Sequence, residues 1–551
     1  MLDWLKGYRR ADLPGDVGAG VIVAMMMIPQ GMAYAMVAGL PPVAGLYASI
    51  APPILYALFG TSSAQSVGPM AIIALMTASA LGPLAMPGTA LYATLAGQLA
   101  LLSGAVLLAC GLLRVGFLAN FFSRPVMSGF TLGSSVVIAL GQVDTLLGGS
   151  PLALGSGVLR GPSALLGIGA IAFLLLARRY GARLLRCLGM APAAADIVVR
   201  LAPMLLVLAS LLLVSALQLD ARGVRTIGAV PSGLPRLQLV FSAAHWQPLG
   251  KPALLIGFMS FLIAMSGAQA LALKRFDKLH TNRELIGLGL ANLGSALSGG
   301  YPVTGSLSRS AVNFAAGART QLAGVISAAL LAGALVLPTG WLAPLPLPVL
   351  AATIIVAVLG MLDLGTLRTA WRYDRADALA LVATGGGVLL LGVESGVVLG
   401  LLLSLGAMIW RESRPHIAVL GRIAGTEHFR NVDRYPAETQ PRVLLLRVDA
   451  GLFFGNLEAV NGRIEDELEA HPAARHLVLV LSAVNAIDTS ALFGLVELNT
   501  TLTNRGVTLH LAEVKGPVLD RLRGSALLPA LSGRVFMSTA NAWDALARDG
   551  G

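Results

Sequence analysis

The chain has 551 residues, of which 56% are hydrophobic and only 12% are charged, and its formal net charge is +11. Soluble globular proteins carry roughly twice this fraction of charged residues, so the composition excludes an ordinary soluble enzyme. The mean hydropathy is +0.77, and apolar runs long enough to cross about 30 Å of hydrocarbon recur, which indicates a polytopic α-helical membrane protein.

The positive charge belongs to the first 440 residues. Residues 441–551 hold 10 basic and 12 acidic side chains, a net charge of −2, which leaves 29 basic and 16 acidic residues, a net of +13, in 1–440. The basic residues flank apolar segments, as the positive-inside rule predicts, so we expect no nucleic-acid partner. Cys110 and Cys187 form no metal motif, and we expect neither a metal nor a cofactor.

The membrane part divides into 14 predicted apolar segments. In chain order they are 17–39, 44–60, 67–84, 89–112, 125–146, 161–178, 195–218, 252–273, 284–299, 307–318, 320–339, 343–362, 377–392 and 394–410. With the N-terminus inside, most loops rich in Arg and Lys also fall inside, the loop 219–251 being the main exception. An even number of crossings returns the C-terminal part to the cytoplasm.

The C-terminal part has a different pattern. Three stretches are typical of buried strands and one of an amphipathic helix: "RVLLLRVDAGLFF" (442–454), "HLVLVLSAV" (476–484), "VTLHLAEV" (507–514) and, for the helix, "EAVNGRIEDELEAH" (458–471). Alternating strands and helices predict a small α/β domain. The sequence therefore predicts a transmembrane domain (1–411), a linker (412–440) and a cytoplasmic domain (441–551).

The third and tenth apolar segments are short or broken by Gly and Pro. They occupy matching places in two sets of seven, which is the pattern of an inverted-repeat secondary transporter with its site between the interrupted helices. In "GTSSAQSVGPMAI" (60–72), Ser66 or Gly68 is predicted to cap a helix that has Pro69 in its first turn.

The tenth segment lies in "GGYPVTGSLSRSAVNFAAGART" (299–320), where Ser306 or Ser308 is predicted to cap a helix that runs toward Arg319. If both broken segments enter the membrane extended and become helical halfway, their two helix N-termini meet. Each end brings unpaired N–H groups and a partial positive charge, so together they form a ready anion site.

Arg309 places a full positive charge in the tenth segment. A charge in hydrocarbon costs at least about 2.5–3.5 kcal/mol, so we expect Arg309 to face a cavity and attract an anion. Two other roles stay open from the residues alone: a structural ion pair, or a position near the membrane surface. Five hydroxyl residues stand near it: Tyr301, Thr304, Ser306, Ser308 and Ser310.

The first segment offers Gln30 and Tyr34, which are four residues apart and therefore share one face of a helix. An amide and a phenol can donate to an anion without adding charge, or they can bond to neighbouring helices, and both interpretations stay open. Gln269, in the eighth segment, is a weaker candidate of the same kind. Three consecutive methionines are expected to serve packing: Met25, Met26 and Met27.

Two long stretches of the membrane part resemble one known family. They are "PPVAGLYASIAPPILYALFGTSSAQSVGPMAI" (41–72) and "LGLANLGSALSGGYPVTGSLSRSAVNFAAGART" (288–320). The family is the SulP family of anion transporters, the sulfate-permease family that includes prestin. The stretch "LVLVLSAVNAIDTSALFGLVEL" (477–498), with "RVDAGLFFGNLEAV" (447–460) before it, resembles the family's C-terminal STAS domain. The similarity runs nearly end to end.

The resemblance implies seven plus seven inverted segments, with a mobile core (segments 1–4 and 8–11) and a gate (5–7 and 12–14). It also implies a homodimer in the lipid bilayer that works by alternating access. The substrate would be a small anion of the sulfate, bicarbonate, chloride or dicarboxylate class, with a proton as a candidate co-substrate. The family's substrate-binding positions correspond here to Gln30, Tyr34, Val67, Gly68, Met70, Ser308 and Arg309.

The sequence departs from the family at one position. Many members have an acidic residue in segment eight that is associated with cation or proton coupling, and Ile263 stands about where it would fall. Sodium coupling through that position is therefore not expected. Glu394 and Asp144 are the remaining acids predicted near membrane depth, each solvated at a segment end.

In the STAS-like domain, the residues that begin the helix after a strand are expected to cap it rather than to be phosphorylated: Asp488, Thr489 and Ser490. The chain carries no Walker loop, HExxH motif or nucleophile–base arrangement, so we expect no enzymatic activity. Other functions stay open: a proton-coupled nucleobase transporter of related fold, a membrane-bound STAS signalling receptor and a passive anion channel.

Overall fold

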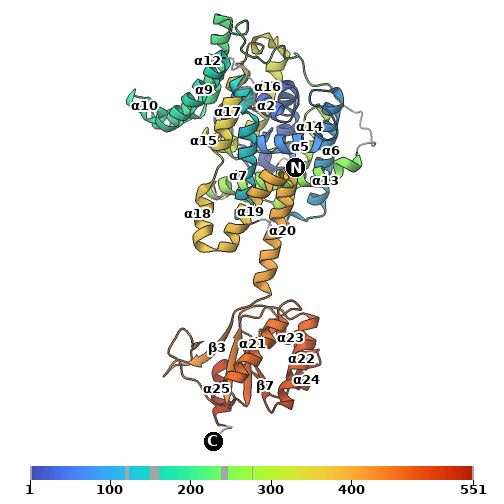
Figure 1. Cartoon of the computed structure of the whole chain (residues 1–551), viewed down its shortest axis with the longest axis vertical. Coiled ribbons are helices and arrows are strands. Elements are labelled where there is room, and N and C mark those ends of the chain that lie inside the picture. The colour runs from blue at the N-terminus through green and yellow to red at the C-terminus, as the bar shows by residue number, and fades with distance from the viewer. Residues whose placement is uncertain (1–2, 118–122, 149–160, 238–245, 276, 549–551) are drawn as a thin grey trace, which may run out of the picture. The chain divides into compact units, whose positions relative to one another are not determined.

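The computed structural model describes residues 3–117, 123–148, 161–237, 246–275 and 277–548. Part of the predicted loop 219–251, residues 238–245, lies outside them. The chain forms two compact units, Met1–Ser404 and Leu405–Gly551 (Figure 1). The first unit is helical except for two short strands, and the second is an α/β unit.

Each of the first seven predicted segments contains at least one helix. The helices of this half are α2 (Leu13–Val37), α3 (Pro42–Tyr47), α4 (Ala51–Phe59), α5 (Ala71–Leu81), α6 (Ala90–Leu112), α7 (Arg124–Gly141), α8 (Val143–Leu147), α9 (Gly161–Leu176), α11 (Pro192–Arg200) and α12 (Ala202–Leu217), with the short α1 (Asp3–Lys6) and α10 (Ala182–Cys187) beside them.

The second seven segments contain helices as well. They are α13 (Trp246–Arg275), α14 (Thr281–Leu297), α15 (Leu307–Ala315), α16 (Leu322–Val336), α17 (Leu347–Leu359), α18 (Leu364–Tyr373), α19 (Arg375–Leu391) and α20 (Val393–Glu412). Among the described residues, 8 helices are long and apolar enough to cross a membrane, or 9 if one bent pair counts as a span. The fourteen crossings stay a prediction, because several predicted segments consist of shorter helices.

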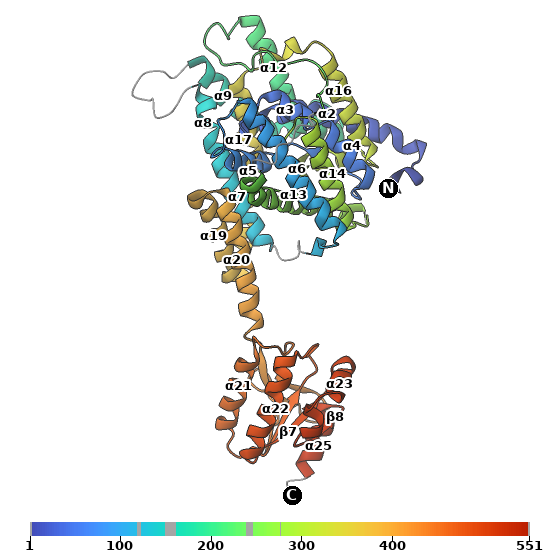
Figure 2. The ribbon, with the colours of Figure 1, turned by 90° about the vertical axis from the view of Figure 1, so that its right-hand side faces the viewer.

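Helices of the two halves pack directly against each other. Helix α14 contacts α6 and α4, and α16 contacts α2; Figure 2 shows α14 beside α6. Gly104 of α6 faces Gly289 of α14 so closely that a Cβ on Gly104 would lie 2.8 Å from the Gly289 carbonyl oxygen. Small residues at such a crossing allow the two backbones to approach, so glycine sets the distance between the halves.

The second unit is built on one six-stranded sheet in the order β4-β3-β5-β6-β7-β8. The strands are β3 (Ile417–Arg422), β4 (Phe429–Asn431), β5 (Val443–Val448), β6 (His476–Val480), β7 (Thr508–Ala512) and β8 (Val535–Phe536). Strands β5 to β8 are parallel, and β3 is antiparallel to both of its neighbours. The helices are α21 (Leu457–Ala470), α22 (Thr489–Asn504), α23 (Gly516–Arg523), α24 (Leu527–Ala530) and α25 (Thr539–Arg548).

The apolar residues of this sheet form two cores, one with α21 and α22 and one with α25. The three predicted strands and the predicted helix are confirmed. Strands β3 and β4, however, lie within 412–440, where the sequence predicts a linker. These strands are short and directly follow an apolar helix, so their alternating apolar and polar residues do not stand out from the end of the membrane part in the sequence. Asp488 caps α22, because its Oδ1 accepts from the Ala491 N–H at 2.7 Å.

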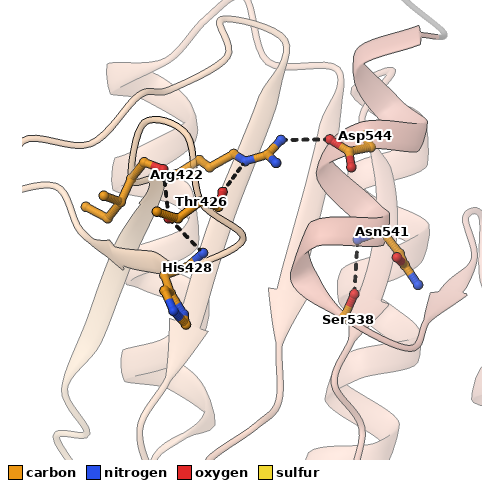
Figure 3. Close-up of polar contacts among 7 residues, drawn as sticks. Arg422, Thr426, His428, Ser538, Asn541 and Asp544 are labelled. Atoms are coloured by element: carbon orange, nitrogen blue, oxygen red, sulfur yellow. Dashed lines mark hydrogen bonds and ion pairs between the residues drawn. The ribbon is translucent and has the colours of Figure 1, made fainter.

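The turn between β3 and β4 is held onto α25 (Figure 3). Arg422 donates from Nε to the Thr426 carbonyl at 2.7 Å and from Nη1 to Asp544 Oδ1 at 2.9 Å. Both partners of this ion pair are partly exposed, so we expect it to contribute only about 0–1 kcal/mol. Its role is to fix the orientation of the hairpin on the sheet.

Asp449, directly after β5, joins this strand to the residue that precedes β3. Its Oδ1 accepts from Arg447 Nε at 2.5 Å, and its Oδ2 lies 2.8 Å from His416 Nδ1. Burial by itself would raise the pKa of Asp449, but the hydrogen bonds from Arg447 and His416 outweigh it and hold the pKa below its usual value. The carboxylate therefore stabilises the folded unit only while it is ionised.

We predict that Asp449→Asn flattens the acid side of the stability profile. Because the folded pKa is depressed, the contribution of Asp449 is fully present above the unfolded pKa of about 3.9 and is lost as the pH falls through the folded value. Thermal unfolding of the full-length protein between pH 7 and pH 3 should show a smaller loss for Asp449→Asn than for the parent. The exposed Asp466→Asn is the control, and equal loss in all three proteins would contradict the prediction.

Candidate functional site

The two broken segments meet through their backbones. Strand β1 (Val67–Gly68) pairs antiparallel with β2 (Thr304–Gly305), Val67 opposite Gly305 and Gly68 opposite Thr304. Each strand is followed by a short helix, α5 of 11 residues and α15 of 9. The N-termini of α5 and α15 therefore lie together, as the sequence predicted, and each contributes about half an elementary positive charge.

The predicted start of α5 was wrong. The helix begins at Ala71 with Met70 in the N-cap position, so neither Ser66 nor Gly68 caps it and Pro69 precedes it. The reason is tertiary: Val67 and Gly68 are extended because they pair with β2.

The start of α15 agrees with one of the two predicted alternatives. Ser306 is its N-cap residue, although its side chain makes no capping hydrogen bond and its hydroxyl lies 3.2 Å from that of Ser308. The helix ends at Ala315, short of Arg319. Gly317 has a φ of +99°, a left-handed conformation that interrupts a helix at little cost only at glycine.

Side chains supply the hydrogen bonds that the extended residues 60–66 cannot make as a helix. Inside a membrane each backbone N–H and C=O needs such a partner. Gln321 Nε2 donates to the Gly60 and Ser62 carbonyls (2.5 and 3.2 Å), and Glu284 Oε1 accepts from the Thr61 and Ser62 N–H groups (2.6 and 3.0 Å). Asn313 Nδ2 donates to the Ala64 carbonyl (3.0 Å), and Ser310 Oγ accepts from the Ser66 N–H (2.9 Å). One further bond is between backbones, from the Ser306 N–H to the Ser66 carbonyl (3.0 Å).

The extended stretch before α15 is held by α14. Asn292 donates to the Val303 carbonyl at 3.0 Å and accepts from the Val303 N–H at 2.9 Å. Ser295 Oγ donates to the Tyr301 carbonyl at 2.6 Å. Many backbone groups of both irregular segments thus find partners within the protein, as extended backbone at membrane depth requires.

Arg309 lies in the first turn of α15 and is 1% exposed. Its Nη1 donates to the Pro69 carbonyl at 2.7 Å, which ties α15 to the residue before the N-cap of α5. Its Nε and Nη2 are buried and have no hydrogen-bond partner among the described residues. Arg309 is therefore enclosed by the protein, and two charged donors remain without a partner among the described residues, beside the two helix ends. Its depth in the membrane stays a prediction.

Two glycines allow this close approach. A Cβ on Gly68 would lie 2.5 Å from Met27 Cε and 3.5 Å from Arg309 Nη2. A Cβ on Gly305 would lie 1.7 Å from Gln65 Nε2, which donates to the Ala264 carbonyl at 3.2 Å. Any larger residue at either position would push a buried side chain out of the site.

The other predicted site residues are placed differently from one another. Helix α2 contacts both α5 and α15. Its Tyr34 is 8% exposed and lies near enough to Arg309 for an ionised phenol there to feel the guanidinium charge. Gln30, one turn earlier, has a buried Oε1 with no hydrogen-bond partner in the described structure. Ser308 is exposed, and so is the weaker candidate Gln269.

Sequence analysis assigned no role to Tyr301. It is 0% exposed, its hydroxyl has no hydrogen-bond partner among the described residues, and it lies near enough to Arg309 for an ionised phenol there to feel the guanidinium charge. The only sequence signal was that it is the single tyrosine of the tenth-segment stretch.

The expectation that Asp144 is solvated is confirmed, but the sequence did not identify the acids that are buried. Asp144 is exposed and Glu394 half-buried, whereas Asp16 and Glu284 are 0% and 1% exposed. Asp16 accepts hydrogen bonds from the N–H groups of Arg319 and Thr320 at 2.6 and 3.0 Å, before α16.

Comparison with known proteins places this arrangement. The model of the sulfate permease family matches residues 13–384. The chain belongs to the sulfate permease family. The STAS domain model matches residues 434–542 of this permease. A probable sulfate transporter of Mycobacterium tuberculosis is 35% identical over 558 residues, covering 98% of this chain and 97% of that protein. The chloroplastic sulfate transporter 4.1 of Arabidopsis thaliana is 33% identical over 533 residues, covering 92% and 76%.

Solved structures share the permease fold. Murine solute carrier 26 family member A9, an anion transporter in an inward-facing state, superposes with a TM-score of 0.87 at 21% identity, covering 99% of this chain and 93% of that one. The transmembrane domain of a cyanobacterial bicarbonate transporter, BicA, gives 0.60 at 22% identity, covering 72% and 99%. At these identities the likeness shows the fold alone. The permease is thus a polytopic membrane protein of an anion-transporter family with a C-terminal STAS domain, and it is a transporter rather than an enzyme.

Proposed function

We propose that this permease is a secondary active transporter that carries a small inorganic or carboxylate anion by alternating access. One observation carries the proposal: Arg309, in the first turn of α15 and hydrogen-bonded to Pro69 before α5, is buried and its Nε and Nη2 have no partner in the part of the chain that the structure describes. A buried charged donor without a partner is costly, and an anion would satisfy both donors at once.

In this proposal Arg309 supplies the full charge and the helix ends supply backbone N–H groups around Val67, Gly68 and Met70. Tyr34 and Gln30 line the side formed by α2, and Ser308 stands at the exposed edge of the site. The relatives named above are a probable sulfate transporter and a sulfate transporter, one structural neighbour is a bicarbonate transporter, and a planar guanidinium fork is well suited to an oxyanion.

The working protein is proposed to be a homodimer in the cytoplasmic membrane, with the N-terminus and the STAS domain inside. Segments 1–4 and 8–11 would move as the core against the gate, carrying the anion across. The side chain of Ile263 cannot bind a cation, so we expect no sodium dependence, and a proton or a counter-anion would supply the driving force.

Uptake into proteoliposomes tests this function. The purified permease should accumulate at least one anion from a panel of radiolabelled sulfate, bicarbonate, chloride and dicarboxylates when a pH gradient or a counter-anion gradient is imposed. Accumulation against a concentration gradient separates a carrier from a passive channel. Uptake of no anion under any gradient would reject the proposal.

Removal of the STAS unit separates transport from signalling. The truncation should begin after Glu412, where α20 ends, because a cut at residue 441 would leave β3 and β4 without the sheet. A carrier keeps anion uptake without residues 413–551, at a lower rate if the domain is regulatory. A receptor whose membrane part only senses would show no transport in either form.

A further inference from the structure

One arginine joins both broken segments at the end opposite to the strand pair. Arg275, the last residue of α13, donates from Nη1 to Ser63 Oγ at 3.3 Å and from Nη2 to the Ala318 carbonyl at 2.5 Å. Its guanidinium carbon lies 4.4 Å from the centroid of the Phe314 ring. A single side chain thus contacts the arm that leads into β1, the last turn of α15 and the chain that leaves α15.

The Ser63 hydroxyl is fixed from two sides. It accepts from Arg275 and donates to Asp277 Oδ2 at 2.7 Å. Ser63 stands four residues before Val67 in β1, and Phe314 stands five residues after Arg309. The contacts of Arg275 therefore lie a few residues from the candidate anion site, about 7.5 Å along the helix from Arg309 to Phe314 and up to about 13 Å along the extended chain from Ser63 to Val67.

Helix α15 and the extended arm lie side by side over this distance. They are joined near the strands by the Ser66 N–H and Ser310 Oγ, and further along by Asn313 Nδ2 and the Ala64 carbonyl. Arg275 closes the same interface at its far end. Because β1–β2 fixes one end and Arg275 the other, the angle between α15 and the arm is determined at two points. That angle sets where the Arg309 guanidinium lies.

The charge of Arg275 is the competing explanation. The charged groups near Arg275 are Arg319, Asp277 and Asp16. The positive charge of Arg275 could by itself attract anions toward the site without positioning any element. Charge and geometry are separable, because lysine keeps the charge but lacks the planar fork that donates in two directions while stacking on an aromatic ring.

We propose that Arg275 is a positioning residue for the anion site: it sets the angle of α15 against the extended arm and thereby the anion affinity. The proposal rests on the proposed transport function. It predicts an effect on binding rather than on the rate of the carrier movement, since the contacts of Arg275 within the described residues are with elements of the proposed core.

The test measures anion uptake by the full-length permease in proteoliposomes. In Arg275→Lys, KM for the transported anion should rise about tenfold while the maximal rate stays within about twofold of the parent, as expected for the loss of a charge-assisted hydrogen bond. Ser63→Ala should raise KM in the same direction by a smaller factor. The double variant should be no worse than Arg275→Lys alone, because the two residues form one contact.

Controls separate positioning from attraction and from misfolding. Arg319→Lys, which changes an exposed side chain nearby, should keep the parent KM. The KM change of Arg275→Lys should persist when ionic strength is raised with an untransported salt, whereas an effect of charge at the mouth is screened.

Four results would overturn the proposal. They are an unchanged KM in Arg275→Lys, an effect that disappears at high salt, strictly additive single variants, and an unchanged KM in Ser63→Ala if Arg275→Lys does not fold. Absence of saturable uptake in the parent would instead reject the transport function itself.

Discussion

Arg309→Ala is expected to lower saturable anion uptake by at least about 100-fold, because it removes the full positive charge of Arg309 beside the two helix ends and two buried donors at once. Uptake by proteoliposomes, with each anion of the panel, measures this. Arg309→Lys should be intermediate: it keeps the charge but cannot bond to the Pro69 carbonyl and to an oxyanion in one plane.

The stability of the same variant is expected to move in the opposite direction. In the parent without anion, Nε and Nη2 of Arg309 are buried and unpartnered in the described structure, which costs free energy of folding. Arg309→Ala should therefore unfold at the same temperature as the parent or a higher one in anion-free detergent, a trade between function and stability that marks a binding residue. Arg319→Ala is the matched control for uptake.

Two outcomes would contradict the site. One is uptake of every anion at the parent rate in Arg309→Ala. The other is loss of uptake together with a large fall in unfolding temperature, which would make Arg309 a structural residue that ties α15 to Pro69.

Local patterns predicted much of this fold. Apolar length and basic loops identified the membrane part, and strand–helix alternation identified the C-terminal unit, because both signals are carried by neighbouring residues. The two interrupted segments were visible for the same reason: Gly, Pro and Ser break apolar runs at matching places. Their meeting followed from symmetry of position and was confirmed by the pairing of β1 with β2.

Contacts between distant residues were not predictable in the same way. Helix α5 starts later than its Ser, Gly and Pro signals indicate, because pairing with residues 304–305 keeps 67–68 extended. Arg275 looked like one of several basic residues of a loop, yet its partners are Ser63, Phe314 and Ala318. Only the tertiary structure distinguishes Arg275 from the loop arginines and lysines that merely follow the positive-inside rule.

Buried acids show the same limit. The sequence indicated Asp144 and Glu394 as the acids near membrane depth. Asp16 and Glu284 stand at the start of a segment, where solvation is the default expectation. Each is instead buried and accepts hydrogen bonds from two backbone N–H groups, Asp16 from residues 319–320 and Glu284 from residues 61–62. A carboxylate before an apolar run is also the signature of a helix start, which is why composition alone did not single them out.

Glu284→Ala is expected to unfold the permease more readily than any other substitution considered for the membrane unit. Glu284 accepts four hydrogen bonds: Tyr56 Oη at 2.7 Å, the Thr61 N–H and hydroxyl at 2.6 Å each, and the Ser62 N–H at 3.0 Å. Alanine leaves these donors buried without an acceptor, at about 1–3 kcal/mol each before relaxation. The unfolding temperature of the full-length protein should fall by several degrees or more, and the yield of folded protein should decrease.

The arm that Glu284 holds leads directly into β1, so function should be lost with stability rather than independently of it. Glu284→Gln keeps one carbonyl acceptor and the side-chain volume, so it should retain part of both, while Asp220→Asn, an exposed acid of the same unit, should change neither. A Glu284→Ala protein that unfolds like the parent would show that water or other groups satisfy the arm. It would also mean that the four hydrogen bonds to Glu284 contribute little to stability in the parent, and they could then not offset the cost of removing its carboxylate from water.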